Sequence, residues 1–201
     1  MALALIWVSW SEGKPSAREN ATLREAAYRG AARRGEFSVD PSTKTDRFVY
    51  GADIRKVLFV CMGNVCRSPM AAALLKRRLS HRAGRLVVQS AGVAALVGEP
   101  AEQHALELMR ERGIDLSGHR ARQLTTEMAS AFDLILVMEE AQQRNVERIF
   151  PTGRGRVHRL GRFGNFEVPD PYRQSRPAFE RSLALIERGI DDFERALWKA
   201  S

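Results

Sequence analysis

Short apolar runs alternate with helix-like segments along most of this 201-residue chain. These runs predict strands at 56–61, 86–90, 133–138 and 156–160, and the strand at 133–138 is continuously apolar, as expected when both of its faces are covered. Strands that alternate with helices favour a parallel sheet with right-handed crossovers and helices on both faces. The predicted fold class is therefore α/β.

Helices are predicted from helix-start signals, helix-stop signals and apolar spacing, at 68–81, 99–112, 125–131, 139–150 and 177–199. Gly113 follows the second of them as a C-terminal stop, and Thr125 or Thr126 caps the third. The last helix is the clearest, because apolar residues at four-three spacing predict one buried face: Phe179, Leu183, Ile186, Ile190, Phe193 and Leu197.

Residues 1–54 differ from the rest of the chain. They combine a short apolar start, an Arg/Ala/Glu-rich stretch at 21–34 and a turn-rich piece at 40–42, and no packed core is evident. We expect an N-terminal extension here; a disordered tail and a misassigned translation start are both open interpretations. Residues 55–201 are expected to form the functional domain.

The composition narrows the functional classes. The formal net charge is +8 and the pI is about 10.2, but acidic residues interleave with the basic ones. This pattern favours solvated helix faces and attraction of anionic substrates over nucleic-acid binding. The two cysteines and four histidines show no zinc-ligand spacing, so neither a metal nor another cofactor is expected.

The cysteine content and the apolar runs also bear on location. Two cysteines in one short segment exclude a disulfide scaffold and favour the reducing cytoplasm. No apolar run reaches the length of a membrane span, so no membrane insertion is expected. The apolar start at 1–10 lacks a basic n-region and a convincing cleavage site, which argues against a signal peptide.

The chemistry centres on one loop, which consists of Cys61, Met62, Gly63, Asn64, Val65, Cys66, Arg67 and Ser68. In a strand–loop–helix unit, consecutive main-chain amides and the positive end of the helix can surround a tetrahedral anion. Arg67 can bind two oxygens of that anion, and the same field favours the thiolate form of Cys61. The loop therefore predicts an oxyanion cradle beside a thiol nucleophile, which suits attack on phosphorus.

Other features of this loop fit the same interpretation. Gly63 and Asn64 tolerate positive φ, and Ser68 followed by Pro69 suits the N-cap and first position of a helix. The Ser68 hydroxyl also has a second, compatible interpretation as a hydrogen-bond donor to the thiolate.

This loop resembles the signature of the low-molecular-weight protein tyrosine phosphatases, which is a cysteine, five residues, then arginine and serine or threonine. The late Asp170-Pro171-Tyr172 resembles the second half of that signature, and 90–92, 118–124 and 133–138 match further. The resemblance covers about residues 55–198. It implies a three-layer sandwich with a four-stranded parallel sheet and flavodoxin-like winding.

The resemblance also implies roles for individual residues. Cys61 would form a cysteinyl-phosphate, Arg67 would bind the phosphoryl oxygens, and Asp170 would protonate the leaving oxygen. By itself, Asp-Pro is only a common turn signal. Asn64, Ser90 and His119 correspond to residues that hold the shape of the loop; Tyr172 and Leu96 would line the substrate rim, with simple packing as the alternative. The implied activity is hydrolysis of phosphotyrosine in proteins.

Cys66 has two interpretations of equal weight. A reversible disulfide with Cys61 would protect the nucleophile from irreversible oxidation. Alternatively, Cys66 is a small apolar residue that fills space in the loop.

Two other functions compete with phosphatase activity. An arsenate reductase of the same fold would need further cysteines downstream, and none follows Cys66. A non-catalytic phosphate-binding module would not require Cys61, Arg67 and Asp170 together. Hydrolysis of an aryl phosphate by the wild type and by Cys61→Ser would separate these functions.

The resemblance is strongest to the bacterial enzymes associated with exopolysaccharide or capsule production. It implies a phosphotyrosine protein as partner, in particular the phosphorylated cytoplasmic tail of a tyrosine autokinase. Arg173 replaces a second aromatic residue found beside Asp-Pro in the animal enzymes, so a more open and more basic rim is expected. The protein is expected to be a monomer.

Overall fold

The computed structural model describes residues 54–82 and 85–198. Four strands, β1 (Lys56–Cys61), β2 (Val87–Gly92), β3 (Leu134–Val137) and β4 (Val157–Arg159), form one parallel sheet in the order β2-β1-β3-β4. This confirms the predicted α/β fold with its four-stranded parallel sheet. The expected N-terminal extension lies, except for Ile54, outside the described residues.

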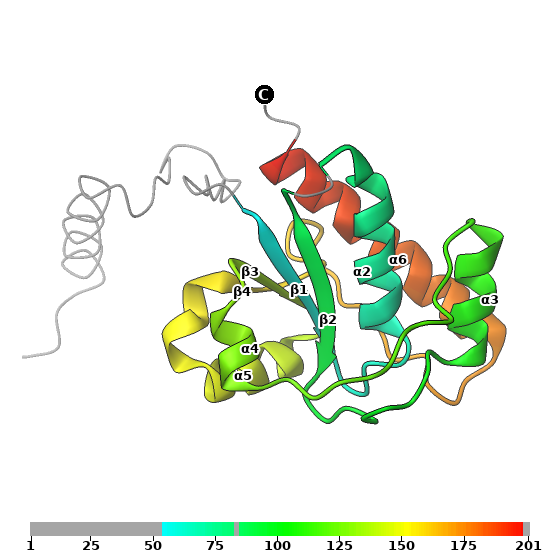
Figure 1. The fold of residues 1–201 in the computed structure, drawn as a ribbon, viewed down its shortest axis with the longest axis horizontal. Helices are drawn as coiled ribbons and strands as arrows, with labels where there is room; N and C mark the ends of the chain where they lie inside the picture. Colours follow the sequence, from blue (N-terminus) through cyan, green and yellow to red (C-terminus); the bar gives the residue numbers. More distant parts are fainter. Residues whose placement is uncertain (1–53, 83–84, 199–201) are drawn as a thin grey trace, which may run out of the picture. The chain divides into compact units, whose positions relative to one another are not determined.

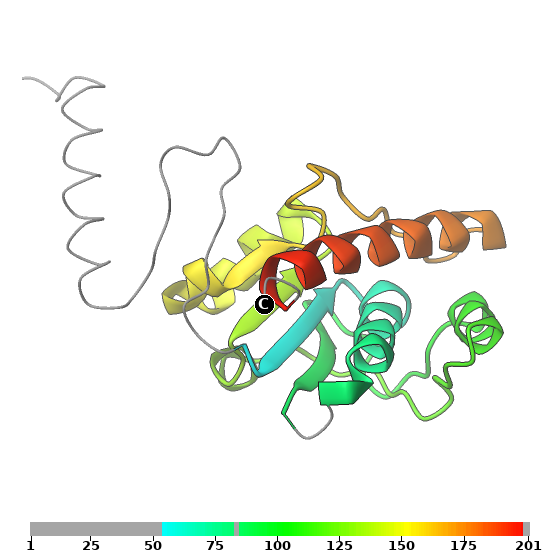
Figure 2. The same cartoon turned by 90° about the horizontal axis from the view of Figure 1, so that it is seen from above.

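Helices cover both faces of the sheet in three layers (Figure 1). On one face lie α2 (Arg67–Arg78), α3 (Gln103–Glu111) and α6 (Arg176–Leu197), and on the other lie α4 (Thr126–Ser130) and α5 (Glu140–Ile149). Both views show α2 beside α6, which is orange and red in Figure 2. Two short 3-10 helices, η1 (Ser80–Arg82) and η2 (Pro151–Arg156), complete the described part.

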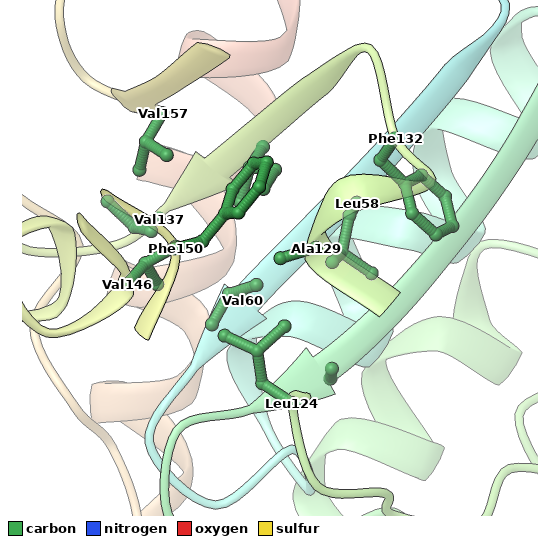
Figure 3. Packing of buried hydrophobic residues seen from close by; sticks show 11 residues of the cluster. Leu58, Val60, Leu124, Ala129, Phe132, Val137, Val146, Phe150 and Val157 are labelled. Carbon is green, nitrogen blue, oxygen red and sulfur yellow. The ribbon is translucent and has the colours of Figure 1, made fainter. Parts of the chain in front are cut away.

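The two central strands, β1 from residue 57 onward and β3, are continuously apolar because both of their faces are buried. Leu58 and Val60 point toward α4 and α5, and they pack in one apolar cluster with Phe132, Val137 and Phe150 (Figure 3). Residues 57 and 59 point to the opposite face and are fully buried there as well. Residues 57–60 of the central strand therefore alternate between two buried faces, and this packing holds the carboxyl end of the strand in place.

The ends of several elements differ from the sequence prediction; the first helix, predicted to reach residue 81, ends at Arg78. The helix predicted from residue 99 begins at Gln103, because Glu102 is its N-cap and accepts a hydrogen bond from the His104 amide at 2.7 Å. The second strand extends past Ser90 to Gly92. The predicted stop at Gly113 is confirmed by its φ of +66°.

The strand order places a crevice at the carboxyl edge of the sheet. Chain connections leave in opposite directions from β1 and β3, which are neighbours, so the loops that follow these two strands diverge. Ligands in such sheets bind at this point. Residues 61–67 connect β1 to α2 at this point, so we expect the functional site in this loop.

Candidate active site

The loop between β1 and α2 curls around the sulfur of Cys61. Asn64 adopts the left-handed conformation, with φ of +57°, which turns the chain back on itself. The Asn64 amide lies 3.3 Å from the Cys61 Sγ, and the Ser68 Oγ lies 3.0 Å from it. The Cys61 side chain is buried, with 2% of the residue exposed.

Gly63 and Asn64 both tolerate positive φ, and among residues 61–68 Asn64 alone adopts it. One local prediction about this loop is wrong. Ser68 is not the N-cap of α2, because the helix already begins at Arg67, and Cys66 occupies the cap position without a side-chain hydrogen bond. The Ser68 hydroxyl instead faces Cys61 and accepts a hydrogen bond from the Asn64 Nδ2 at 2.9 Å.

Arg67 is a buried cation between two carboxylates. Its Nη1 donates to the Glu139 Oε1 at 2.5 Å and to the Val168 main-chain oxygen at 3.0 Å, and its Nη2 donates to the Asp170 Oδ2. The side chain is only 1% exposed. Its Nε is buried without a hydrogen-bond partner among the described residues. One donor of this guanidinium therefore remains for an anion in the loop.

Sequence reasoning missed Glu139, which accepts a hydrogen bond from Arg67, and Gln142, which holds Glu139 in place. Glu139 directly follows Met138 at the carboxyl edge of β3, the neighbour of β1. Gln142 is fully buried; its Nε2 donates to the Glu139 Oε2 at 3.2 Å, and its Oε1 accepts from the Met138 amide at 3.0 Å. The position of Glu139 at the end of a strand next to β1 was the signal that could have identified it.

A small pocket of about 110 Å³ opens over the nucleophile. Three stretches of chain far apart in sequence form its wall, which consists of Cys61, Met62, Gly63, Val65, Cys66, Ala94, Leu96, Asp170 and Tyr172. The structure thus brings together the predicted nucleophile, the predicted general acid and both predicted rim residues. Arg67 lies behind this wall and contacts it through Asp170.

Two partly exposed side chains, Leu96 and Tyr172, line the pocket, and a basic residue lies beside Tyr172. Leu96 and Tyr172 are each 39% exposed, so their side chains remain available to a ligand. The guanidinium carbon of Arg173 lies 5.3 Å from the centre of the Tyr172 ring. Asp170 is oriented by the Tyr172 amide, which donates to its Oδ1 at 3.2 Å.

The supporting residues converge on Asn64. The His119 Nε2 lies 2.7 Å from the Asn64 main-chain oxygen, and the Arg122 amide donates to the Asn64 Oδ1 at 3.0 Å. The Arg122 Nε in turn donates to the Ser90 main-chain oxygen at 2.8 Å. The structure therefore places His119 and Ser90 where loop support was predicted, and Ser90 takes part through its carbonyl group. Sequence reasoning missed Arg122 as an individual residue, although it lies within the matching segment 118–124.

Cys66 lies in the same pocket wall as Cys61, and both are free thiols. Burial is the main cause that raises the pKa of Cys66 far above its ordinary value, and the neighbouring Cys61 raises it further. Cys66 is therefore a neutral thiol at physiological pH, in contrast to the role that the loop offers to Cys61.

Two other kinds of feature are absent from the part of the chain that the structure describes. Residues 54–82 and 85–198 contain no group of three or more histidine, cysteine or acidic side chains arranged to hold a metal ion. No helix within these ranges combines the length and the apolar character needed to cross a membrane.

Solved structures with this fold include bacterial tyrosine phosphatases. Vibrio vulnificus Wzb in complex with benzylphosphonate matches with a TM-score of 0.67 and 37% identity, over 71% of this chain and 99% of that one. The Erwinia amylovora tyrosine phosphatase amsI matches with a TM-score of 0.69 and 39% identity, over 74% of this chain and 97% of that one.

The sequence relatives carry matching names. A probable low molecular weight protein-tyrosine-phosphatase EpsP of Ralstonia solanacearum is 49% identical over 138 residues, which are 69% of this chain and 92% of the relative. Wzb of Escherichia coli K12, a low molecular weight protein-tyrosine-phosphatase, is 40% identical over 142 residues, 70% of this chain and 94% of the relative. The family model described as low molecular weight phosphotyrosine protein phosphatase matches residues 56–201. The chain therefore belongs to the low molecular weight phosphotyrosine protein phosphatase family.

Proposed function

We propose that this protein hydrolyses phosphotyrosine in proteins, with Cys61 as nucleophile, Arg67 as phosphoryl-binding residue and Asp170 as general acid. One observation carries the assignment of residues: the buried Arg67 keeps an unpaired Nε within the described residues, while Cys61 and Asp170 line the same small pocket. A cationic donor, a thiol and a carboxyl group are what thiol-based cleavage of an aryl phosphate needs.

The first step transfers the phosphoryl group to sulfur. The Cys61 thiolate attacks phosphorus, the bond between phosphorus and the tyrosine oxygen breaks, and Asp170 gives its proton to that oxygen. The Asn64 amide and the Ser68 hydroxyl, at 3.3 Å and 3.0 Å from the sulfur, stabilise negative charge there before attack. Arg67 binds the equatorial oxygens as their charge redistributes.

The second step regenerates the enzyme. Asp170, now ionised, takes a proton from a water molecule that attacks the cysteinyl-phosphate. The sulfur–phosphorus bond breaks, inorganic phosphate leaves and Cys61 returns as the thiolate. The leaving group in this step is the Cys61 sulfur. The Ser68 hydroxyl, which lies 3.0 Å from it, stabilises the thiolate that forms.

The dimensions of the pocket support an aromatic substrate. The cavity of about 110 Å³ places the sulfur below a rim formed by Leu96 and Tyr172. An aryl ring can extend from the phosphoryl group to this rim and pack between the two apolar side chains. The shorter side chain of phosphoserine would leave the rim unfilled, so we infer a preference for phosphotyrosine.

The experiment that tests this function measures release of phenol and phosphate from an aryl phosphate. Cys61→Ser and Arg67→Ala should each lose nearly all turnover, and phosphorus NMR of quenched wild type should detect a phosphocysteine. Arg148→Ala, an exposed change on α5, serves as the matched control and should keep full activity. Retained turnover in Cys61→Ser would exclude the mechanism, and thiol-dependent reduction of arsenate would favour the reductase instead.

We further propose a phosphorylated tyrosine-kinase tail in polysaccharide production or export as the substrate, with the enzyme acting as a cytoplasmic monomer. The resemblance to exopolysaccharide- and capsule-associated phosphatases supports this proposal. The net charge of +8 and the basic rim residue Arg173 also suit an anionic tail. Residues 55–201 are proposed as the phosphatase domain, a boundary close to the family match that begins at residue 56.

A further inference from the structure

A second, larger cavity lies outside the catalytic pocket. Its volume is about 810 Å³, and residues of α2, the middle of β2 and the segment 113–122 that follows α3 line it. It shares no lining residue with the pocket over Cys61. We call it the basic cavity, after the basic side chains in its wall: Lys76, Arg77, His119, Arg120 and Arg122.

The positive charge of the basic cavity is not neutralised from within the described structure. None of its four lysine and arginine side chains forms a salt bridge with a carboxylate in residues 54–82 or 85–198. The one carboxylate in its wall, Asp115, accepts hydrogen bonds from the Ser117 amide at 2.8 Å and hydroxyl at 3.0 Å. Arg176, in contrast, forms salt bridges with three glutamates.

The arginines of the basic cavity are held in place by neutral acceptors. The Arg122 Nε donates to the Ser90 main-chain oxygen and its Nη2 to the Gln89 Oε1, both at 2.8 Å. The Arg77 Nη1 donates to the Gly113 main-chain oxygen at 2.9 Å. These contacts fix the guanidinium groups without cancelling their charge, so the cost of ordering them is met before a ligand arrives.

Arg120 and His119 complete this arrangement. The Arg120 Nη1 donates to the main-chain oxygens of Ser117 at 3.0 Å and His119 at 2.6 Å. Burial is the first cause that lowers the pKa of His119, and Arg122, Arg120 and Lys76 lower it further. Lys76 of α2 and Arg120 and Arg122 of the segment that follows α3 line the same cavity, and their charges act on the same imidazole.

We propose that the basic cavity is a second anion-binding site and that it takes a phosphate-bearing ligand. A phosphoryl group offers three oxygens and close to two negative charges, which match several fixed guanidinium donors. A carboxylate offers less charge and fewer oxygens to these donors. Two sources of the same chemistry fit: a free phosphorylated molecule, or a second phosphotyrosine on a substrate tail that occupies the catalytic pocket.

The probe for this site is inorganic phosphate, followed by amide shifts in NMR at constant ionic strength with chloride as the balancing anion. The titration uses the Arg67→Ala variant, which weakens phosphate binding in the catalytic pocket, and wild type is run beside it. We expect saturable shifts at residues 76–77 and 113–122 in both proteins. Absence of saturation at these residues in both proteins would overturn the proposal.

A charge-matched pair of variants separates a site from general electrostatic attraction. Lys76→Ala with Arg120→Ala should weaken phosphate binding by about tenfold or more, because two charged contacts are lost. Arg85→Ala with Arg148→Ala removes the same charge from exposed positions outside both cavities and should leave the affinity unchanged. Equal weakening in both double variants would mean electrostatic screening only and would exclude a site.

Peptides distinguish the two sources of the ligand. If the second phosphate comes from the substrate, wild type should cleave a doubly phosphorylated tyrosine peptide more efficiently than a singly phosphorylated one, and Lys76→Ala with Arg120→Ala should lose that preference. If the ligand is a free molecule, phosphate still binds the cavity but the peptides are cleaved alike. Turnover of a small aryl phosphate should be unchanged in this double variant, so a failure of this proposal is distinguishable from a failure of the phosphatase assignment.

Discussion

Cys61 is surrounded by donors that the chain supplies within seven residues, whereas Arg67 depends on partners from distant segments. Asn64 and Ser68 reach the sulfur from the same loop. Glu139 and Asp170 reach the guanidinium from positions 72 and 103 residues away. The nucleophile is therefore a local product of the loop, but the placement of the cation depends on the complete fold.

Asp170→Ala should discriminate between leaving groups. Phenolates with high pKa need a proton as they leave, so their turnover should fall by about 10² to 10⁴, while activated aryl phosphates should lose much less. The measurement is kcat for a series of aryl phosphates of graded leaving-group pKa, with Asp115→Ala as a matched exposed control. A uniform loss across the series would remove Asp170 from the general-acid role.

Cys66 should protect Cys61 during oxidation. Peroxide converts the Cys61 thiolate into a sulfenic acid, and the Cys66 sulfur then displaces its hydroxyl as water to form a disulfide. Because burial raises the pKa of Cys66, this second step should be faster at higher pH. Cys66→Ser should recover poorly with a thiol reductant after peroxide, and mass spectrometry should show the intraloop bond in wild type. Full recovery of the variant would assign Cys66 to packing.

Residues within the loop could be predicted from sequence, and residues that meet it from elsewhere mostly could not. The spacing of Cys61 and Arg67 by itself indicates an anion-binding loop with a thiol nucleophile, whereas Asp170 was identified through the family resemblance. Glu139 and Arg122 show no such local pattern, since their roles arise only when parallel strands bring separate segments to one edge. Ser68 was wrongly predicted to be a helix N-cap, because serine is a common N-cap residue and can also donate a hydrogen bond to a thiolate.

At the scale of elements, α6 approaches the end of β4 at a single small residue. A Cβ added to Gly189 would lie 2.6 Å from the Leu160 Cγ and 2.8 Å from the Leu160 main-chain oxygen. The absence of a side chain at this point allows the helix to lie against the sheet. Helix propensity and packing therefore make opposite demands on residue 189.

Gly189→Ala should destabilise the protein although alanine is the better helix former. Overpacking against main chain costs about 1–3 kcal/mol, which exceeds the gain of about 1 kcal/mol in helix propensity. Gly155→Ala is the control, since open space surrounds that position and its φ is not positive. Chemical denaturation of both variants measures the difference; greater stability in Gly189→Ala would contradict the packing argument.

His158 in β4 is held as a neutral imidazole. Its Nδ1 accepts from the Arg162 Nη1 at 2.9 Å, and its Nε2 lies 3.2 Å from the Gly155 main-chain oxygen. Burial, followed by the charge of Arg162, lowers the pKa of His158 to about 4. The folded state therefore binds a proton at this position only in strongly acidic solution.

Stability should fall as the pH drops from about 6.5 to about 4. In this window the unfolded chain protonates His158 and the folded protein does not, so the free energy of unfolding decreases by up to about 3 kcal/mol. Above pH 6.5 the imidazole is neutral in both the folded and the unfolded state, so His158 no longer changes the free energy of unfolding with pH. Denaturation curves of wild type and His158→Gln at several pH values should show a smaller acid loss in the variant; parallel curves would contradict this assignment.

The positions of the elements followed from the apolar pattern, but their exact ends did not. Buried strands such as 134–137 read as continuous apolar runs because both faces are covered. The start of α3 was misplaced by several residues because Glu99-Pro100 looks like a helix start, whereas the hydrogen bond that caps the helix comes from Glu102. Capping depends on which side chain folds back, and several candidates in sequence compete for that role.

At the scale of the molecule, excess positive charge is present both at the rim and in the basic cavity. Arg173 lies beside Tyr172, which lines the catalytic pocket, and the net charge of the chain is +8. Such a field raises the rate at which anionic partners arrive, and salt screens it over about 10 Å at 0.1 M. The field should therefore change the association rate of anionic substrates and leave the rate of the chemical step unchanged.

A phosphorylated acidic tail should therefore be a better substrate than a neutral phosphotyrosine peptide at low salt. The ratio of their kcat/KM values should shrink as sodium chloride rises from about 0.05 M to about 0.5 M, because screening shortens the range of attraction. Arg173→Gln should reduce the ratio at low salt without changing kcat for a small aryl phosphate. A ratio that does not depend on salt would remove electrostatic selection and leave the catalytic assignment intact.

The contact between Arg67 and Asp170 has a consequence for the end of the catalytic cycle. The Asp170 carboxylate is tethered next to the guanidinium, so it competes for that cation at an effective concentration on the order of millimolar or higher. Inorganic phosphate formed by hydrolysis competes with the Asp170 carboxylate for Arg67. An incoming phosphotyrosine faces the same competition, but the contacts of its ring with Leu96 and Tyr172 add to its affinity. The side chain that supplies the proton in the first step thus also promotes release of the product. The enzyme should therefore release inorganic phosphate even in solutions rich in phosphate.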